Sequence, residues 1–251
     1  MLTLVLTSVL AAYALACIAL FLMQRSMIYF PQPRTLATPV MALEVPGARL
    51  NVSVLPRAGA KALVYFGGNA EDVAASLPSL ARLFPQHALY LMHYRGYGGS
   101  TGKPTEAALA ADALALFDRV HAQHPQVLAM GRSLGSGLAV RLASMRPVSR
   151  LVLVTPYDSI AAIAAGQFPY FPVRWLLTDK FESWRYAPKV GAPTTILAAQ
   201  NDTLIPPASS RQLQARFKPG LASYVLVPDA GHNTISGEPV YEAALAQIAR
   251  E

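Results

Sequence analysis

One serine of the sequence has neighbours that could turn it into a nucleophile. Ser133 is the central residue of the segment 131–135, Gly-Arg-Ser-Leu-Gly, which follows an apolar run and precedes a helical pattern. A G-x-S-x-G sequence between a strand and a helix is typical of a sharp turn that exposes the serine hydroxyl. The two glycines leave room for the strand and the helix to approach each other. We therefore predict that Ser133 is a catalytic nucleophile rather than a residue that only caps a helix.

A nucleophilic serine needs a base and a group that orients the base, and the sequence offers candidates for both. His232 is one of five histidines and lies in a loop between the last apolar run and the last helical pattern. In a doubly wound sheet, this loop opens at the same edge as the serine turn. Asp202 follows the apolar run 194–199, and Asp158 follows the preceding run. We predict His232 as the base and Asp202 as the acid, with Asp158 as its rival.

An acyl-transfer site also needs donors for the negatively charged oxygen of its tetrahedral intermediate. The backbone N–H of Leu134, directly after the nucleophile, is one expected donor. The second is expected from the glycine-containing loop 67–70, which follows the apolar run 61–66. We expect Asn69 to open a helix there, with its N-terminal amides directed at the anion.

The elements that must position these residues follow from the pattern of apolar runs and helical stripes. Short apolar runs of this kind are typical of strands buried on both faces of a parallel sheet. Helical patterns alternate with them, which predicts a mostly parallel, doubly wound α/β domain. The segments 41–45 and 48–55 are expected to add antiparallel strands at one edge. The predicted parallel strands are 61–66, 88–93, 126–130, 150–154, 194–199 and 222–227.

One connection is much longer than the others and predicts a cap over the carboxyl edge of the sheet. About 40 residues separate the runs that end at Val154 and begin at Thr194, whereas connections in α/β units usually have two to six. We expect a cap insertion at about residues 156–190. Its aromatic residues suggest an apolar pocket for an acyl group, although ordinary packing within a cap would also explain them. These residues are Phe168, Tyr170, Phe171 and Trp175.

The N-terminal segment predicts a membrane anchor. No charged side chain occurs from Leu2 to Met23, and a helix of this length spans ~30 Å, the thickness of a bilayer's hydrocarbon core. We expect residues 1–24 to cross the membrane once and residues 25–251 to form the catalytic domain. A cleaved signal, or a lipid-modified start at Cys17, is the alternative. Arg25 and Arg34 follow the run with no basic residue before it, which favours a cytoplasmic catalytic domain.

Other classes of site find little support in the sequence. The net charge is +7, but no cluster of Lys and Arg interleaved with aromatics indicates a nucleic-acid partner. The segment 96–104 resembles a phosphate loop but has Pro104 where such loops carry Ser or Thr. His121 and His124 lack further nearby ligands for a metal. We therefore expect neither a metal nor a cofactor.

With these residues in hand, the chain resembles the Bem46-like branch of the α/β-hydrolases, relatives of the membrane-anchored ABHD-type lipid hydrolases. The resemblance covers roughly residue 24 to the C-terminus. It depends on the segments 25–31 (Arg-Ser-Met-Ile-Tyr-Phe-Pro), 68–70 (Gly-Asn-Ala), 94–98 (Tyr-Arg-Gly-Tyr-Gly), 131–135, 157–159 (Tyr-Asp-Ser), 202–206 (Asp-Thr-Leu-Ile-Pro) and 231–232 (Gly-His).

The resemblance implies an α/β-hydrolase fold, Asp202 as the triad acid, and oxyanion amides from Asn69 and Leu134. One position departs from the family pattern, because Gly67 stands where the family usually has histidine, so the support of the oxyanion loop is expected to differ. The expected activity is hydrolysis of carboxylic esters or thioesters through an acyl-enzyme. The alternatives are an amidase or peptidase, and a non-catalytic scaffold tethered to the membrane.

Overall fold

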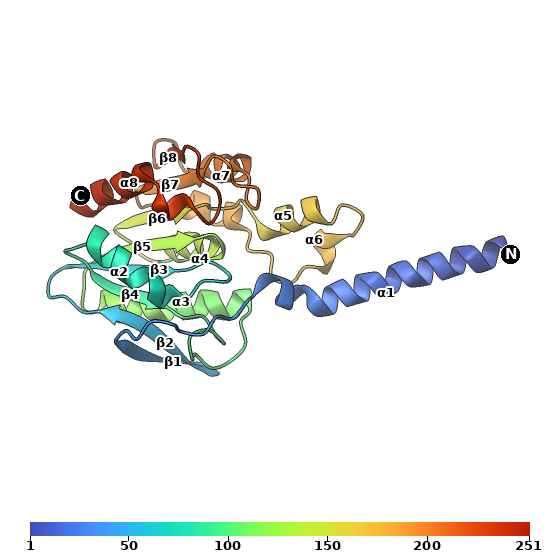
Figure 1. The fold of residues 1–251 in the computed structure, drawn as a ribbon, viewed down its shortest axis with the longest axis horizontal. Helices are drawn as coiled ribbons and strands as arrows, with labels where there is room; N and C mark the ends of the chain where they lie inside the picture. Colours follow the sequence, from blue (N-terminus) through green and yellow to red (C-terminus); the bar gives the residue numbers. More distant parts are fainter.

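The apolar runs of the sequence form strands of one eight-stranded sheet in the computed structural model, which describes residues 1–251. The strand order across the sheet is β1-β2-β4-β3-β5-β6-β7-β8 (Figure 1). The predicted strands are confirmed to within two residues at each end. They are β1 (Val40–Val45), β2 (Ala48–Leu55), β3 (Lys61–Phe66), β4 (Ala88–Met92), β5 (Gln126–Arg132), β6 (Arg150–Val154), β7 (Thr194–Ala199) and β8 (Ala222–Val227).

The sheet is parallel except at the edge formed by its first two strands. β1 pairs antiparallel with β2, and β2 pairs antiparallel with β4, whereas all later pairings are parallel. In β3, the side chains of Ala62 and Val64 contribute to one apolar core, and those of Leu63 and Tyr65 to the other. A strand covered on both faces has no exposed side, which explains why these runs lack polar alternation.

Helices cover both faces, as expected of a doubly wound domain. α2 (Val73–Leu83) and α8 (Pro239–Arg250) pack on one face. α3 (Glu106–His121), α4 (Leu134–Ala143) and α7 (Pro207–Gln214) pack on the other. A helix was expected to open at Asn69, and this is wrong. α2 begins at Val73 because the Asp72 carboxylate accepts the backbone N–H of Ala74 and acts as the N-cap.

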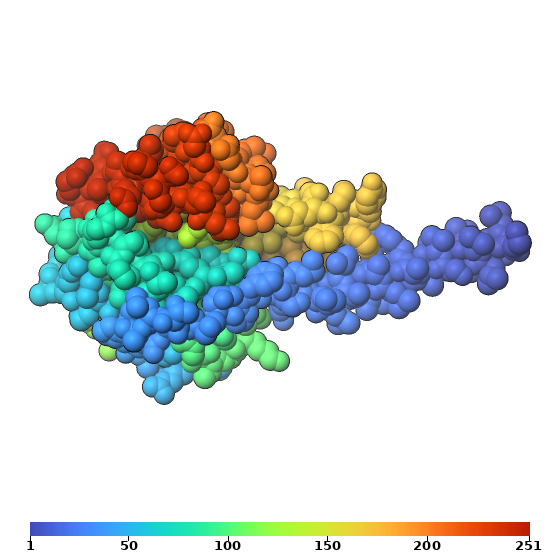
Figure 2. Space-filling view, in the orientation of Figure 1, coloured from blue at the N-terminus to red at the C-terminus, as the bar shows by residue number.

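The long connection between β6 and β7 carries its own short helices. They are α5 (Ile160–Gln167), α6 (Val173–Leu176) and the 3-10 turns η1 (Ser183–Arg185) and η2 (Ala187–Lys189). We call residues 156–190 the cap segment. A third 3-10 turn, η3 (Ile235–Gly237), precedes α8. Figures 1 and 2 show α5 and α6 protruding from the sheet domain on the same side as the N-terminal helix.

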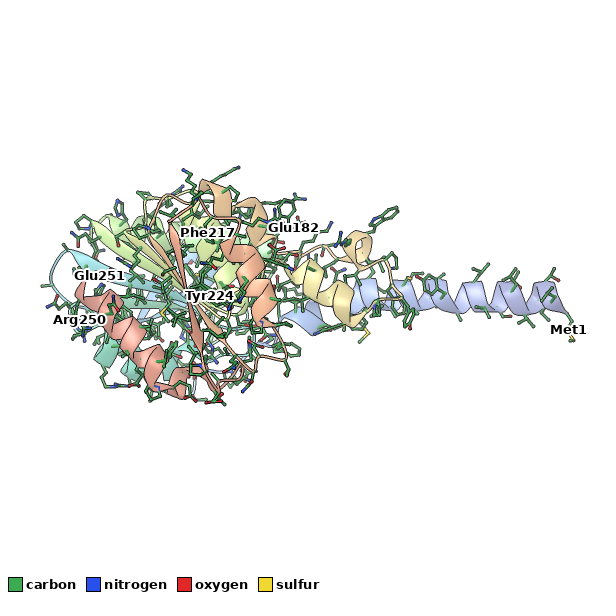
Figure 3. All side chains as sticks on the ribbon, turned by 90° about the horizontal axis from the view of Figure 1, so that it is seen from above. Met1, Glu182, Phe217, Tyr224, Arg250 and Glu251 are labelled. Atoms are coloured by element: carbon green, nitrogen blue, oxygen red, sulfur yellow. The ribbon has the colours of Figure 1, made fainter.

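The N-terminal helix α1 (Leu2–Ile28) is a single unbroken element. It is long and apolar enough to cross a membrane, with a mean hydropathy of 2.4 over its most apolar window of 18 residues. Figure 3 shows the side chains of its N-terminal half pointing into open space, away from the sheet domain. The boundary that the sequence predicts between residues 24 and 25 falls inside this helix, whose buried residues, Gln24 and Ile28, are both near its C-terminal end.

Candidate active site

Ser133 stands at a strained turn between β5 and α4. Its backbone has φ 50° and ψ −118°, a combination that residues other than glycine rarely adopt. The Ser133 N–H donates to the Val154 carbonyl at 2.9 Å, and the Gly135 N–H donates to the Gly67 carbonyl at 3.1 Å. A Cβ atom at Gly135 would overlap the backbone of Phe66. The glycine thus lets the turn press against the end of β3.

The turn brings the Ser133 hydroxyl to His232, which lies in the loop after β8. The Oγ atom of Ser133 is 3.0 Å from His232 Nε2, and His232 Nδ1 is 2.7 Å from Asp202 Oδ2. A carboxylate only accepts hydrogen bonds, so Nδ1 carries the proton and Nε2 is left to accept the serine proton. The other Asp202 oxygen accepts the backbone N–H groups of Leu204 and Ile205, at 2.9 and 2.7 Å. These bonds fix the carboxylate toward the imidazole.

Asp158, the rival acid, is not part of this arrangement. Its backbone N–H donates to the Ser209 hydroxyl oxygen at 3.0 Å, and its Oδ1 atom is buried without a hydrogen-bond partner. Burial raises the pKa of the Asp158 carboxyl. Among the other histidines, His93 bonds to the Ser53 hydroxyl and His124 to Tyr90. The structure therefore brings together Ser133, His232 and Asp202, and leaves Asp158 apart.

Two backbone amides close to the serine are free to bind an anion. Asn69 and Leu134 both line the cavity that contains Ser133. No hydrogen bond within the chain uses the backbone N–H of either residue. Gly68 lies against the serine, because a Cβ atom built on it would be 3.8 Å from Ser133 Cβ. Two free amides beside a nucleophile are the arrangement that an oxyanion requires.

The loop that carries Asn69 is supported by residues that the sequence analysis did not assign a role. Tyr94 donates to the Gly67 carbonyl at 2.7 Å, and Tyr97 donates to the Asn69 carbonyl at 2.6 Å. Glu71 accepts the Gly68 N–H at 2.8 Å. These three hydrogen bonds support the loop at Gly67, Gly68 and Asn69. The family pattern has a histidine at position 67, where this chain has glycine. Burial raises the pKa of the Tyr94 hydroxyl, which therefore remains a donor at physiological pH.

Glu71 is itself held in place from several directions. Its second oxygen accepts the hydroxyls of Tyr65 and Ser76, at 2.8 and 2.7 Å. The guanidinium of Arg132 lies 3.9 Å from the oxygen that binds Gly68, and it also donates to the His232 carbonyl at 3.3 Å. The carboxylate thus links the oxyanion loop to the histidine loop. In the sequence, the only indication of this role is that Glu71 lies three residues after the Gly67-Gly68 pair.

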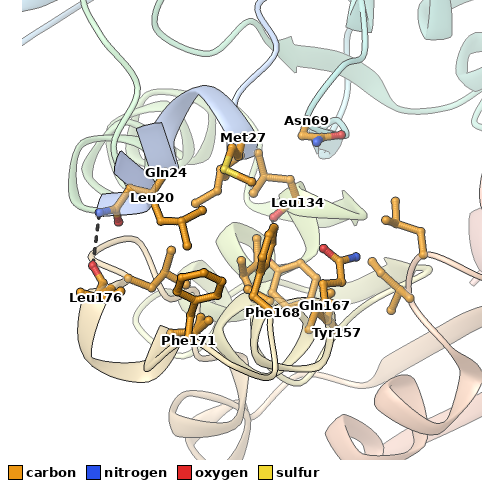
Figure 4. Close-up of a pocket in the computed structure, with 18 of the residues that line it drawn as sticks. Leu20, Gln24, Met27, Asn69, Leu134, Tyr157, Gln167, Phe168, Phe171 and Leu176 are labelled. Carbon is orange, nitrogen blue, oxygen red and sulfur yellow. Dashed lines mark hydrogen bonds between the residues drawn. The ribbon is translucent and has the colours of Figure 1, made fainter. Parts of the chain in front are cut away.

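An apolar cavity of about 190 Å³ extends from Ser133 toward the cap segment (Figure 4). Phe168 and Phe171 line it, as the sequence suggests. Tyr170 and Trp175 do not, and their assignment to the pocket is corrected: their side chains are 86% and 90% exposed. Side-chain direction in this short, irregular segment is set by packing against α1, which the sequence pattern does not reveal.

The cavity has a wall that the sequence analysis missed. Leu20, Gln24, Met27 and Ile28 of α1 line it opposite the cap segment, as Figure 4 shows for the first three. Gln24 donates to the Leu176 carbonyl at 3.2 Å and is buried. A glutamine that ends a long apolar run is a weak signal by itself, because such a residue is equally compatible with a membrane boundary.

Comparisons with known proteins identify the family and the fold of the chain. A sequence model of the family described as the alpha/beta hydrolase fold matches residues 61–183. An uncharacterized protein of Mycobacterium tuberculosis is 33% identical over 84% of this chain and 80% of its own length. Bem46 of Schizosaccharomyces pombe is 29% identical over 58% of this chain and 52% of its own length. The resemblance inferred from the motifs is confirmed.

A lipase and an esterase are also among the similar proteins. The lysophosphatidylserine lipase ABHD12 of Macaca fascicularis is 30% identical over 50% of this chain, and the match covers 37% of that protein. The structure of an esterase from Pyrococcus furiosus superposes with a TM-score of 0.67 at 17% identity, covering 88% of this chain and 98% of the esterase. At this identity the superposition speaks for the fold alone.

Proposed function

The chain belongs to the α/β-hydrolase family, and on that premise we propose that it is a serine hydrolase of carboxylic esters or thioesters. The observation that carries the proposal is the hydrogen-bonded chain from Ser133 through His232 to Asp202, at the end of an apolar cavity. Fold alone does not imply an activity, so the proposal depends on these side chains and on the free amides beside them.

The geometry supports a two-step acyl transfer. Ser133 Oγ attacks the carbonyl carbon of the substrate while its proton passes to His232 Nε2. The backbone N–H groups of Asn69 and Leu134 stabilise the negative charge on the former carbonyl oxygen. His232 then returns the proton to the leaving alcohol or thiol, and the acyl-enzyme remains. A water molecule, deprotonated by His232, attacks this ester, and the carboxylic acid is released with Ser133 restored.

The cavity favours a substrate with an apolar acyl group. Fifteen of the 19 residues that line it are hydrophobic, so an acyl chain in it would leave water for apolar surroundings. The name of the lysophosphatidylserine lipase among the relatives supports a lipid ester with one acyl chain as the substrate class. We infer that acyl-chain length, rather than the leaving group, dominates the selectivity of this site.

Labelling with a fluorophosphonate probe tests the proposal, because such probes react with an activated serine. The full-length protein in detergent should be labelled, and Ser133→Ala should not. A panel of esters with increasing acyl length should then give rising kcat/KM, with amides of the same acyl groups much slower. Absence of labelling in a folded protein would favour the scaffold alternative, and faster amide than ester cleavage would favour the amidase alternative.

We also propose that α1 anchors the enzyme in a membrane, with residues 2–23 in the bilayer. Charge-free helices of this length satisfy their backbone groups internally and partition into lipid. The full-length protein should stay in the membrane pellet after extraction with alkaline carbonate. Recovery of the uncleaved chain in the supernatant would refute the anchor. Digestion of the domain by protease added to intact spheroplasts would refute only its cytoplasmic location.

A further inference from the structure

The cap segment runs alongside α1 and contacts it at two separate levels. At one level, Gln24 Oε1 accepts the backbone N–H and the hydroxyl of Thr178, at 2.7 and 2.8 Å. Further toward the N-terminus, the Tyr13 hydroxyl donates to the Tyr170 carbonyl at 2.9 Å, and its ring stacks on Phe171 with 5.6 Å between centroids. Tyr13 and Gln24 are eleven positions apart on the helix, which corresponds to ~16 Å along the helix axis.

The two segments change from apolar to polar at the same level. On α1, no charged residue precedes Gln24 apart from the chain terminus, and Arg25 is the first charged side chain. On the cap segment, residues 159–178 contain one charged side chain, and Asp179 follows them directly. Arg25 and Asp179 form an ion pair at 3.1 Å. This shared polar level is where a membrane surface would lie if α1 spans the bilayer.

The part of the cap beyond this level has the side chains that favour a lipid interface. Tyr170 and Trp175 are almost fully exposed although both are large aromatics, and Tyr and Trp are enriched where a bilayer meets water. The one charged residue there, Arg174, has a long stem that can carry its charge back to the headgroups. Figures 1 and 2 show this tip of the cap lying beside α1.

The cavity reaches from the serine into this apolar region. Leu20 of α1 and Phe171 of the cap line it, and both lie on the apolar side of the polar level formed by Gln24 and Thr178. Ser133 lines the cavity from the sheet domain, as does its neighbour Leu134, which is labelled in Figure 4. An acyl chain in the cavity therefore has its end in the region of the lipid tails and its ester group at the serine.

We propose that the cap tip, residues 168–176, inserts into the near leaflet of the bilayer, and that the acyl substrate enters the cavity directly from that leaflet. Lipid is the occupant of this surface, because the surface continues the exposed apolar face of α1. No residue in the most apolar 18-residue stretch of α1 is buried. The proposal rests on the proposed anchor and hydrolase activity. It adds that the substrate reaches Ser133 without leaving the lipid phase.

The two tryptophans of the chain allow the insertion to be measured without an activity assay. Trp175 is on the cap tip, whereas Trp184 is in η1, after Asp179 and on the sheet-domain side of the polar level, with Arg185 over its ring at 5.1 Å. The full chain is reconstituted into phosphatidylcholine vesicles with brominated acyl chains. In Trp184→Phe, the emission of Trp175 should be strongly quenched. In the matched control Trp175→Phe, the emission of Trp184 should change little.

The outcome separates this proposal from those it rests on. Protein that floats with the vesicles while Trp175 escapes quenching would overturn the insertion and leave the anchor intact. Protein that does not float would overturn the anchor and the insertion together. Fluorophosphonate labelling of the same preparation in detergent reports on the hydrolase proposal independently of both.

A second measurement tests entry from the leaflet. The double variant Tyr170→Ser and Trp175→Ser removes the two exposed aromatics without touching the cavity lining. Hydrolysis of a monoacyl lipid ester embedded in vesicles should fall by roughly tenfold, since burial of each large aromatic in lipid favours the inserted state. Hydrolysis of a water-soluble short-chain ester should be unchanged. An equal loss in both assays, or no loss on vesicles, would overturn direct entry.

Discussion

Removal of the Glu71 carboxylate should impair catalysis through the oxyanion loop, although Glu71 does not touch the cavity. In Glu71→Ala, the Gly68 N–H loses the charged acceptor that holds it at 2.8 Å. Asn69, whose free amide faces the cavity, is the next residue along this loop. Tyr94 and Tyr97 still hold the carbonyl oxygens of the loop. The loop therefore stays folded, but its amides lose the constraint on their direction.

The magnitude follows from the bond that is lost. A hydrogen bond to a charged group contributes about 1.5–3 kcal/mol, and each ~1.4 kcal/mol corresponds to a factor of ten in rate. If this energy is what keeps the Asn69 amide on the developing oxyanion, kcat should fall by about 10- to 150-fold. Loss of a whole oxyanion donor sets the upper limit, at about 10²–10³ in kcat. KM for a short-chain ester should change little, because the cavity lining is intact.

Steady-state kinetics on a water-soluble ester would measure both parameters. Glu71→Gln should recover most of kcat, because its amide oxygen can still accept the Gly68 N–H. Ser76→Ala is a matched control: it removes a bond to the same carboxylate at 2.7 Å and should lower thermal stability with kcat nearly unchanged. A role for Glu71 in directing the oxyanion amides would be refuted if Glu71→Ala kept wild-type kcat, or if Glu71→Gln and Glu71→Ala lost kcat equally while both remained folded.

Three further predictions concern the reacting groups, pH and the junction with α1. Ser133→Ala should lower kcat by a factor of about 10⁶, and Asp202→Asn should lower it by less. Asp158→Asn should keep a kcat close to that of the wild type. If ester kinetics showed a larger loss of kcat in Asp158→Asn than in Asp202→Asn, the assignment of Asp202 as the acid would be overturned. Burial lowers the pKa of His93 to about 4, so the folded protein binds fewer protons than the unfolded chain between pH 4 and 6.5. The contribution of this neutral imidazole to the free energy of unfolding is complete above about pH 6.5, and roughly 3 kcal/mol of it is lost as the pH falls toward 4. In urea titrations at several pH values, the free energy of unfolding of His93→Gln should therefore fall less steeply with decreasing pH than that of the wild type. Gln24→Leu should lower Tm by roughly 3–8 °C, because the cap loses its buried partner; an unchanged melting curve would show that the Gln24 hydrogen bonds do not stabilise the cap.

The fold was predictable because its signals are local. Each parallel strand is a continuous apolar run, and α3 shows its buried stripe in the sequence, with the Thr105 side chain accepting the Ala108 N–H as the cap. The start of α2 was harder, since Asn69 and Asp72 are both good capping residues. Asp72 caps the helix, and the Asn69 carbonyl accepts tertiary bonds from the Phe30 N–H and the Tyr97 hydroxyl, which hold Asn69 outside the helix.

The candidate site was predictable where topology alone determines proximity. Ser133, His232 and Asp202 follow strands of a parallel sheet, so their loops must meet at one edge. The cavity wall could not be predicted in this way. Which face of α1 meets the cap depends on contacts such as Gln24 with Thr178, between segments far apart in the sequence. For the same reason, Phe171 points inward and Tyr170 outward, although they are neighbours.

The strained turn at Ser133 has a consequence for the biosynthesis of the protein. Its backbone conformation costs of order 1–3 kcal/mol and is maintained by hydrogen bonds that Ser133 and Gly135 donate to the carbonyls of Val154, in β6, and Gly67, directly after β3. His232 lies 99 residues later in the chain. A nascent chain on the ribosome therefore carries the serine, and the residues that hold its turn, long before it carries His232. If Ser133 and His232 act together as we propose, the growing polypeptide has no hydrolase activity until the loop that follows β8 (Ala222–Val227) has been made.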